Sequence, residues 1–64
     1  MKHEYSEEEK ARIAAYPFLT DREREAFDLT VRRGWAIEDA AAEMWVSRST
    51  VKRALASMRR KCLY

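Results

Sequence analysis

The sequence contains only one cysteine, one histidine, one proline and one glycine among its 64 residues. The single cysteine, Cys62, excludes an intramolecular disulfide and a cysteine-based zinc cluster. His3 lies in a charged N-terminal stretch without a second ligand nearby, so we expect no metal and no cofactor. The scarcity of proline and glycine excludes collagen-like, glycine-rich and proline-rich chains.

Long apolar runs are also missing. No stretch approaches the roughly 18 residues that a membrane helix needs, and residues 1–5 lack the apolar region of a signal peptide. We therefore expect a soluble, cytoplasmic protein that forms one domain over residues 1–64. A domain of this size has little room for a deep catalytic cavity. The sequence offers no nucleophile with a base and no phosphate-binding glycine loop, so we predict that it is not an enzyme.

Residues that favour β-strands are scarce. Only five are Val or Ile, and no segment alternates polar and apolar residues with a period of two. Helix formers dominate, and ten alanines stand among the apolar residues. The sequence therefore predicts an all-α fold, a small three- to four-helix bundle with a thin core in which alanine lets the helices approach closely.

The first predicted helix covers residues 6–16. Ser6 and Glu9 form a capping box at its start, and Pro17 disfavours helix at the preceding residue and ends it. Its weak apolar stripe is expected to consist of Ala11, Ala14, Ala15 and Phe18, helped by Ile13.

The second predicted helix covers residues 20–33. Thr20 and Glu23 form another capping box, and Gly34 is the expected end because glycine adopts the left-handed conformation freely. Its inward stripe is expected to consist of Ala26, Phe27, Thr30 and Val31.

Two further helices are predicted over residues 37–44 and 48–62, with Ser47 capping the second. A short helix, a three-residue turn and a longer helix form the layout of a helix-turn-helix. The inward residues of the last helix follow helical spacing: Val51, Leu55, Met58 and Cys62.

Charge is distributed unevenly along the chain. Residues 1–44 hold seven cations and eleven acids, whereas residues 45–64 hold six cations and no acid. An acid-free basic segment on the second helix of a helix-turn-helix is typical of a phosphate-binding surface, although a solvated helix face would have a similar composition. The outward polar residues expected to contact DNA are Arg48, Ser49, Lys52, Arg53, Ser57, Arg60 and Lys61.

A wider pattern extends over residues 18–62. It consists of Leu19–Glu25 (LTDRERE), Gly34, Ala41, Met44, Val46, Ser47, Thr50, Val51, Lys52, Arg60 and Lys61. This pattern resembles the LuxR/GerE-type DNA-binding domain and is nearly as similar to region 4 of bacterial sigma factors. The resemblance implies a helical fold whose penultimate or last helix reads DNA. By the same resemblance, Thr50 contacts the DNA backbone, Lys52 and Arg53 reach bases or phosphates, and Val51 belongs to the core.

The chain departs from the family pattern at three positions. Trp45 stands where the family has a turn glycine, and a left-handed Trp carries a strain of roughly 1 kcal/mol. We therefore expect either a different turn or packing of Trp45 that offsets the strain. Ala36 stands in place of a capping Ser or Thr, and Ala54 in place of a frequent His of the reading helix.

Two functions are compatible with these features. The first is a sequence-specific, DNA-binding transcriptional regulator, with double-stranded DNA as its partner. A single reading helix covers few base pairs, so a homodimer is expected through the first helix or the neighbourhoods of Phe18, Trp35 or Tyr64. The alternative is a region-4-like module that docks on RNA polymerase or another regulator. It is motivated by the acidic first half and by the end of the chain where the dimerisation helix of LuxR-type domains would begin.

Overall fold

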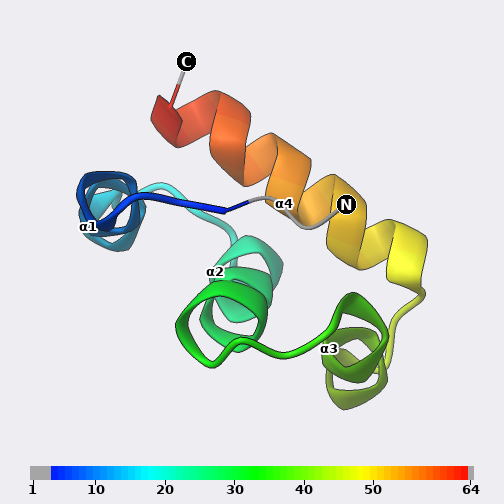
Figure 1. The fold of residues 1–64 in the computed structure, drawn as a ribbon. Helices are drawn as coiled ribbons and strands as arrows, with labels where there is room; N and C mark the ends of the chain where they lie inside the picture. Colours follow the sequence, from blue (N-terminus) through cyan, green and yellow to red (C-terminus); the bar gives the residue numbers. More distant parts are fainter. Residues whose placement is uncertain (1–3, 64) are drawn as a thin grey trace.

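Residues 4–63 are described by a computed structural model, in which they form helices and no strand (Figure 1). The elements are α1 (Glu7–Ala15), α2 (Asp21–Phe27), the π-helical segment η1 (Asp28–Arg32), α3 (Ile37–Met44) and α4 (Arg48–Leu63). The predicted all-α bundle is therefore confirmed. None of the helices in this range combines the length and apolar character needed to cross a bilayer. His3 and Tyr64 lie outside the described residues.

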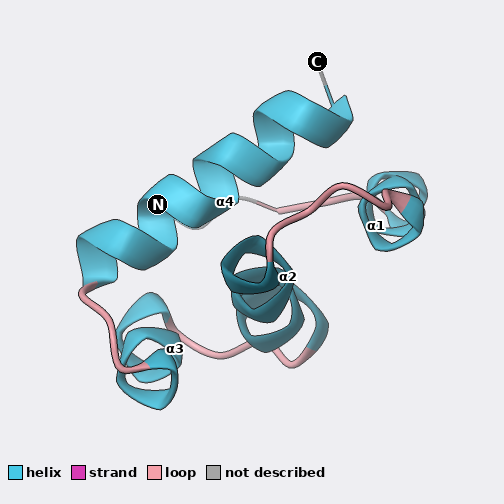
Figure 2. Cartoon of the chain, turned by 180° about the vertical axis from the view of Figure 1, so that it is seen from behind, coloured by secondary structure: helices cyan, strands magenta, loops and turns pink. Residues whose placement is uncertain are grey.

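Helix α4 organises the bundle because it contacts each of the other three α-helices. Figures 1 and 2 show α1, α2 and α3 nearly end-on, with α4 running along one side of the row that they form. Its inward stripe is confirmed, since Val51 and Met58 are fully buried and Leu55 and Cys62 nearly so. One face of α4 thus forms the core, and the opposite face is left to solvent.

Helix α1 has the predicted capping box, in which the Ser6 amide donates to Glu9 Oε1 at 2.9 Å and the Glu9 amide donates to Ser6 Oγ at 3.1 Å. It ends at Ala15, and the residue before Pro17 is extended as expected. The predicted apolar stripe is wrong: Ala11, Ala14, Ala15 and Phe18 are exposed. Because α1 lies at the edge of the bundle, only Ile13 of this helix is buried.

The second predicted helix is not a continuous α-helix. It changes to π-helical winding over η1, where the Arg33 amide donates to the carbonyl of Asp28, five residues earlier, at 3.0 Å. The Thr30 hydroxyl donates to the Ala26 carbonyl at 2.7 Å. In a regular α-helix this carbonyl would accept from the Thr30 amide, so the side chain competes with the backbone for it. This side-chain competition is a local reason for the wider turn. Gly34 then ends the segment in the left-handed conformation, as predicted.

The turn between α3 and α4 contains a left-handed residue, Trp45, with φ 59° and ψ 40°. The Val46 amide donates to the Ala41 carbonyl at 3.0 Å, which closes the end of α3. The Trp45 side chain is 93% exposed. The expectation that the turn differs or that Trp45 packs is therefore wrong on both counts, because the strained turn is kept without compensating burial.

Candidate nucleic-acid interface

The outer face of α4 carries four exposed cations that form no ion pair within residues 4–63. They are Arg48, Lys52, Arg53 and Arg60. At 100° per residue, Arg53 and Arg60 lie nearly opposite the core residue Val51. Ser49 lies on the same outer face, and the structure leaves it exposed. Five of the residues predicted to contact DNA are therefore exposed along an arc of about 140° that runs from Arg48 to Arg53, and we call this arc the outer face of α4.

The spacing of these cations suits an extended anionic partner. Arg48 and Arg60 are twelve residues apart, which corresponds to about 18 Å along a helix axis. Ala56 lies between them along the helix and is half-buried. The cations therefore form two groups, one in the first two turns of α4 and one near its end.

The start of α4 is held by Ser47, as predicted. The Thr50 amide donates to Ser47 Oγ at 3.2 Å, and the two hydroxyl oxygens lie 2.9 Å apart. Thr50 is half-buried, and its hydroxyl is engaged in this cap. The contact with the DNA backbone that the resemblance implies for Thr50 remains a prediction.

Lys61 and Ser57 are directed toward α2 rather than to the outer face. Lys61 Nζ lies 2.8 Å from Glu23 Oε1 and forms an ion pair with it. The Thr20 amide donates to the same oxygen at 2.8 Å, so one carboxylate both caps α2 and binds α4. Lys61 and Ser57 turn away from the other predicted contacts because their helical angles bring them to the flank of α4 that faces α2.

The Glu23 carboxyl is strongly perturbed by this arrangement. Its burial alone would raise its pKa, since a buried charge loses its hydration. Hydrogen bonds from Lys61, Ser57 and the Thr20 amide, together with the Lys61 charge, outweigh burial and lower the pKa from the ordinary 4.5 to about 2. Glu23 therefore stays ionised at neutral pH, and we assign it a structural role.

Two further residues, Arg59 and Cys62, lie near the end of α4. The Arg59 guanidinium donates to the Tyr5 hydroxyl at 3.2 Å, which ties the helix to the segment before α1. Cys62 is buried, and burial, with the nearby Glu23 charge, raises the pKa of its thiol. The thiol is therefore protonated and packs as a small apolar group, as its position predicted.

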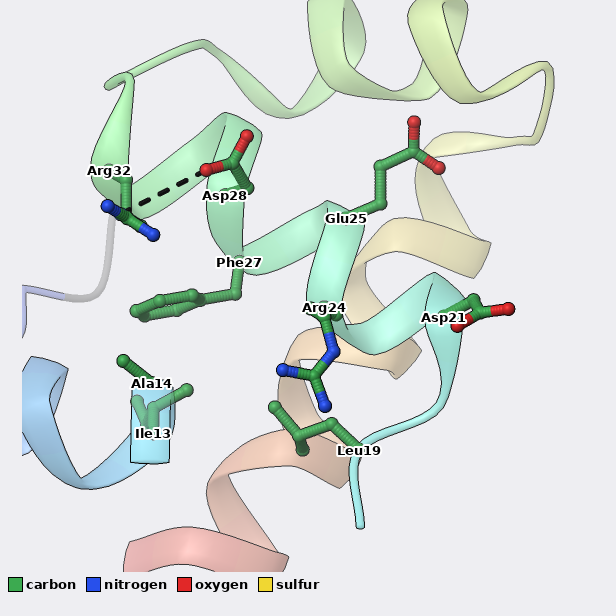
Figure 3. Close-up of a pocket in the computed structure, with 9 residues that line it drawn as sticks. All are labelled: Ile13, Ala14, Leu19, Asp21, Arg24, Glu25, Phe27, Asp28 and Arg32. Atoms are coloured by element: carbon green, nitrogen blue, oxygen red, sulfur yellow. Dashed lines mark ion pairs between the residues drawn. The ribbon is translucent and has the colours of Figure 1, made fainter. Parts of the chain in front are cut away.

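Another cavity lies on the side of α2 that faces α1. Its volume is about 380 Å³, and it is lined by apolar residues of both helices and by charged residues of α2 and η1 (Figure 3). Asp28 in this wall pairs with Arg32 at 4.0 Å and with Arg33 at 3.3 Å. No group of three acidic, histidine or cysteine side chains arranged for a metal ion occurs in the described part of the chain.

Sequence reasoning missed one residue near α4 and two long-range contacts of this helix, Lys61 with Glu23 and Arg59 with Tyr5. It identified Glu23 as a capping residue, but its partner Lys61 is 38 residues away and no local signal connects them. It also left out Arg22, which lines a cleft shared with Arg53. The Thr20–Glu23 capping box was the signal that could have identified Arg22, because it fixes the start of α2 and so places Arg22 in the first turn of that helix.

Comparisons with models of protein families, with curated proteins and with solved structures find no match to this chain.

Proposed function

We propose that this chain is a cytoplasmic, sequence-specific DNA-binding protein that regulates transcription by inserting α4 into the major groove. The observation that carries the proposal is the outer face of α4. It presents four exposed cations that make no ion pair with any residue between 4 and 63, on the second helix of a helix-turn-helix. The major groove is about 12 Å wide and admits one α-helix. The core-facing side of α4 stays packed on the bundle, so the outer face is the side that can enter.

Each polar group of this face has a role in the proposal. Lys52 and Ser49 can reach base edges, where Lys pairs with guanine O6 and N7 and Ser can pair with several bases. Arg53 reaches either bases or phosphates. Arg48 and Arg60, at the two ends of the surface, would contact phosphates on the walls of the groove. The free amides at the start of α4 add a further phosphate contact.

Binding to labelled duplexes tests this proposal. If about five phosphates are contacted, log K should fall against log salt with a slope near −4 to −5. Lys52→Ala should weaken binding to a selected site by roughly 1–3 kcal/mol, whereas Lys10→Ala on α1 serves as the control with the same loss of charge. In-vitro selection from a random pool supplies the site. The proposal is contradicted if the folded protein binds no duplex at low salt.

The same selection addresses the oligomeric state. We propose a homodimer on DNA, because one reading helix recognises few base pairs and two-fold symmetric proteins select palindromic half-sites. A palindromic consensus, together with a sedimentation mass of the complex that equals two chains and one duplex, is the expected result. A single half-site bound by a monomer would contradict the dimer and leave DNA binding intact.

A second candidate is a protein-interaction module that docks on RNA polymerase or another regulator. The observation that favours it is the exposure of two large apolar side chains, Trp45 at 93% and Phe18 at 74%. Exposed Trp residues are common anchors of protein interfaces. Capture of purified polymerase that is lost in Trp45→Ala and retained in Lys52→Ala would support this candidate. Equal capture by Trp45→Ala would count against it.

A further inference from the structure

A cleft of about 270 Å³ lies between the start of α2 and the first half of α4. It is lined by Thr20, Arg22, Glu23, Thr50, Arg53 and Ala54. Ala54 is buried and faces α2, so the position where the family has a frequent His belongs to a packed flank in this chain. The small side chain of Ala54 keeps the cleft open next to the outer face of α4.

Two arginines line the cleft, Arg22 from α2 and Arg53 from α4. Arg22 and Arg53 are both exposed, and neither takes part in an ion pair with any other described residue. Glu23 is the one acid in the lining, but its side chain is only 5% exposed and one of its oxygens already accepts from Lys61 and Thr20. The available charge in the cleft is therefore positive.

The fold itself gives no reason for a cation at position 22. Arg22 lies in the first turn of α2, where the helix dipole favours acids such as its neighbour Asp21. Its side chain is exposed and makes no ion pair in residues 4–63 that would offset this unfavourable position. A negatively charged group from outside the chain would stabilise Arg22 and Arg53 together.

We propose that this cleft holds one phosphate of the DNA backbone, bound by Arg22 from α2 and Arg53 from α4. The inference rests on the proposed DNA binding and extends it, because it adds α2 to the interface and assigns Arg53 to a phosphate rather than to a base. Guanidinium groups match phosphate oxygens through paired N–H donors. A phosphate held between the two helices would fix how deeply α4 enters the groove, and Lys52 and Ser49 would remain to read bases.

The test compares Arg22→Gln with Arg24→Gln on a random-sequence duplex by fluorescence anisotropy. Both variants lose one charge from α2, but Arg24 lines the cavity on the α1 side of the helix (Figure 3). For Arg22→Gln we expect roughly tenfold weaker binding and a salt slope that is shallower by about 0.9. Arg24→Gln should remain near wild type in both measurements. The double variant Arg22→Gln/Arg53→Gln should lose less than the product of the two single losses, because both groups contact the same phosphate.

The outcomes separate this inference from the function on which it rests. If the wild type binds and Arg22→Gln behaves like Arg24→Gln, the phosphate cleft is wrong and DNA binding by α4 stands. If the loss of affinity in the double variant equals the product of the losses in Arg22→Gln and Arg53→Gln, the two arginines do not share one phosphate. If the folded wild type binds no duplex at about 50 mM salt, where such contacts are strongest, DNA binding itself is wrong. Far-ultraviolet circular dichroism of each variant establishes that it is folded.

Discussion

Replacing Lys61 with methionine should destabilise the domain at neutral pH and much less in acid. The substitution keeps most of the apolar stem of Lys61 but removes the ammonium that lies 2.8 Å from Glu23 Oε1. Glu23, with a side chain only 5% exposed, is then left as a buried carboxylate without its main partner. Leaving one charge of a buried pair unpaired costs several kcal/mol.

The expected magnitude follows from the Glu23 pKa. A pKa of about 2 in the folded chain, against an ordinary 4.5, corresponds to about 3 kcal/mol of stability at neutral pH. Lys61 supplies the leading part of that shift, but its side chain is 33% exposed, so solvent weakens the interaction. We therefore expect a loss of about 2 kcal/mol, or a fall in Tm of roughly 10 °C for a domain of this size.

The pH dependence gives the sharper test. Because the pKa of Glu23 is lower in the folded chain than in the unfolded one, its contribution is complete above about pH 4.5 and is lost as the pH falls toward 2. In Lys61→Met, fewer groups oppose the effect of burial, so the pKa of the Glu23 carboxyl rises. The contribution of Glu23 to stability is then largely absent at every pH. The gap between wild type and variant should therefore be widest near pH 7 and close near pH 2.

Urea denaturation followed by circular dichroism at both pH values measures this gap. Lys10→Met is the matched control, because Lys10 pairs at 3.7 Å with Glu7, whose side chain is 93% exposed. Such a surface pair contributes at most about 1 kcal/mol. Equal stability of Lys61→Met and Lys10→Met at pH 7, or a gap of the same size at pH 2, would refute the assignment of Glu23 as a buried anchor.

Two further substitutions probe the turn and the start of α2. Trp45→Gly should stabilise the chain by about 0.5–1 kcal/mol, because glycine relieves the left-handed strain and the exposed indole contributes no burial. A urea midpoint lower than that of the wild type would show instead that Trp45 supports the fold. Thr20→Ala should cost about 1 kcal/mol by removing the acceptor of the Glu23 amide, which lies 3.1 Å from Thr20 Oγ1. Thermal unfolding measures this loss.

The parts of the fold that the sequence predicted depend on neighbours within about four residues. Both capping boxes, the Ser47 cap and the stop at Gly34 are local features of this kind, and the structure has all of them. The change to π-helical winding at η1 was missed. It depends on how the Thr30 hydroxyl competes for a carbonyl inside the helix, and residue types alone do not decide that competition.

The exposed part of the candidate site could be predicted because it follows from the helical periodicity of α4. Helical periodicity separates the core side of α4 from the remaining arc, and the exposed cations Arg48, Lys52 and Arg53 follow from it. Periodicity does not say which flank of that arc another helix covers. Lys61 was therefore assigned to the DNA surface although it pairs with Glu23, and the alanine stripe of α1 was assigned to the core although the edge position of α1 leaves it exposed.

The exposed side chain of Trp45 gives the chain a built-in optical probe. Its indole is 93% exposed, three residues before Arg48, whereas Trp35 is half-buried against the core. A Trp35→Phe variant would carry a single tryptophan, at the corner between α3 and α4 and outside the packed interior. Its emission would respond to whatever approaches the start of α4, while unfolding would change it little. Occupancy of that corner could thus be followed without attaching a label to the protein.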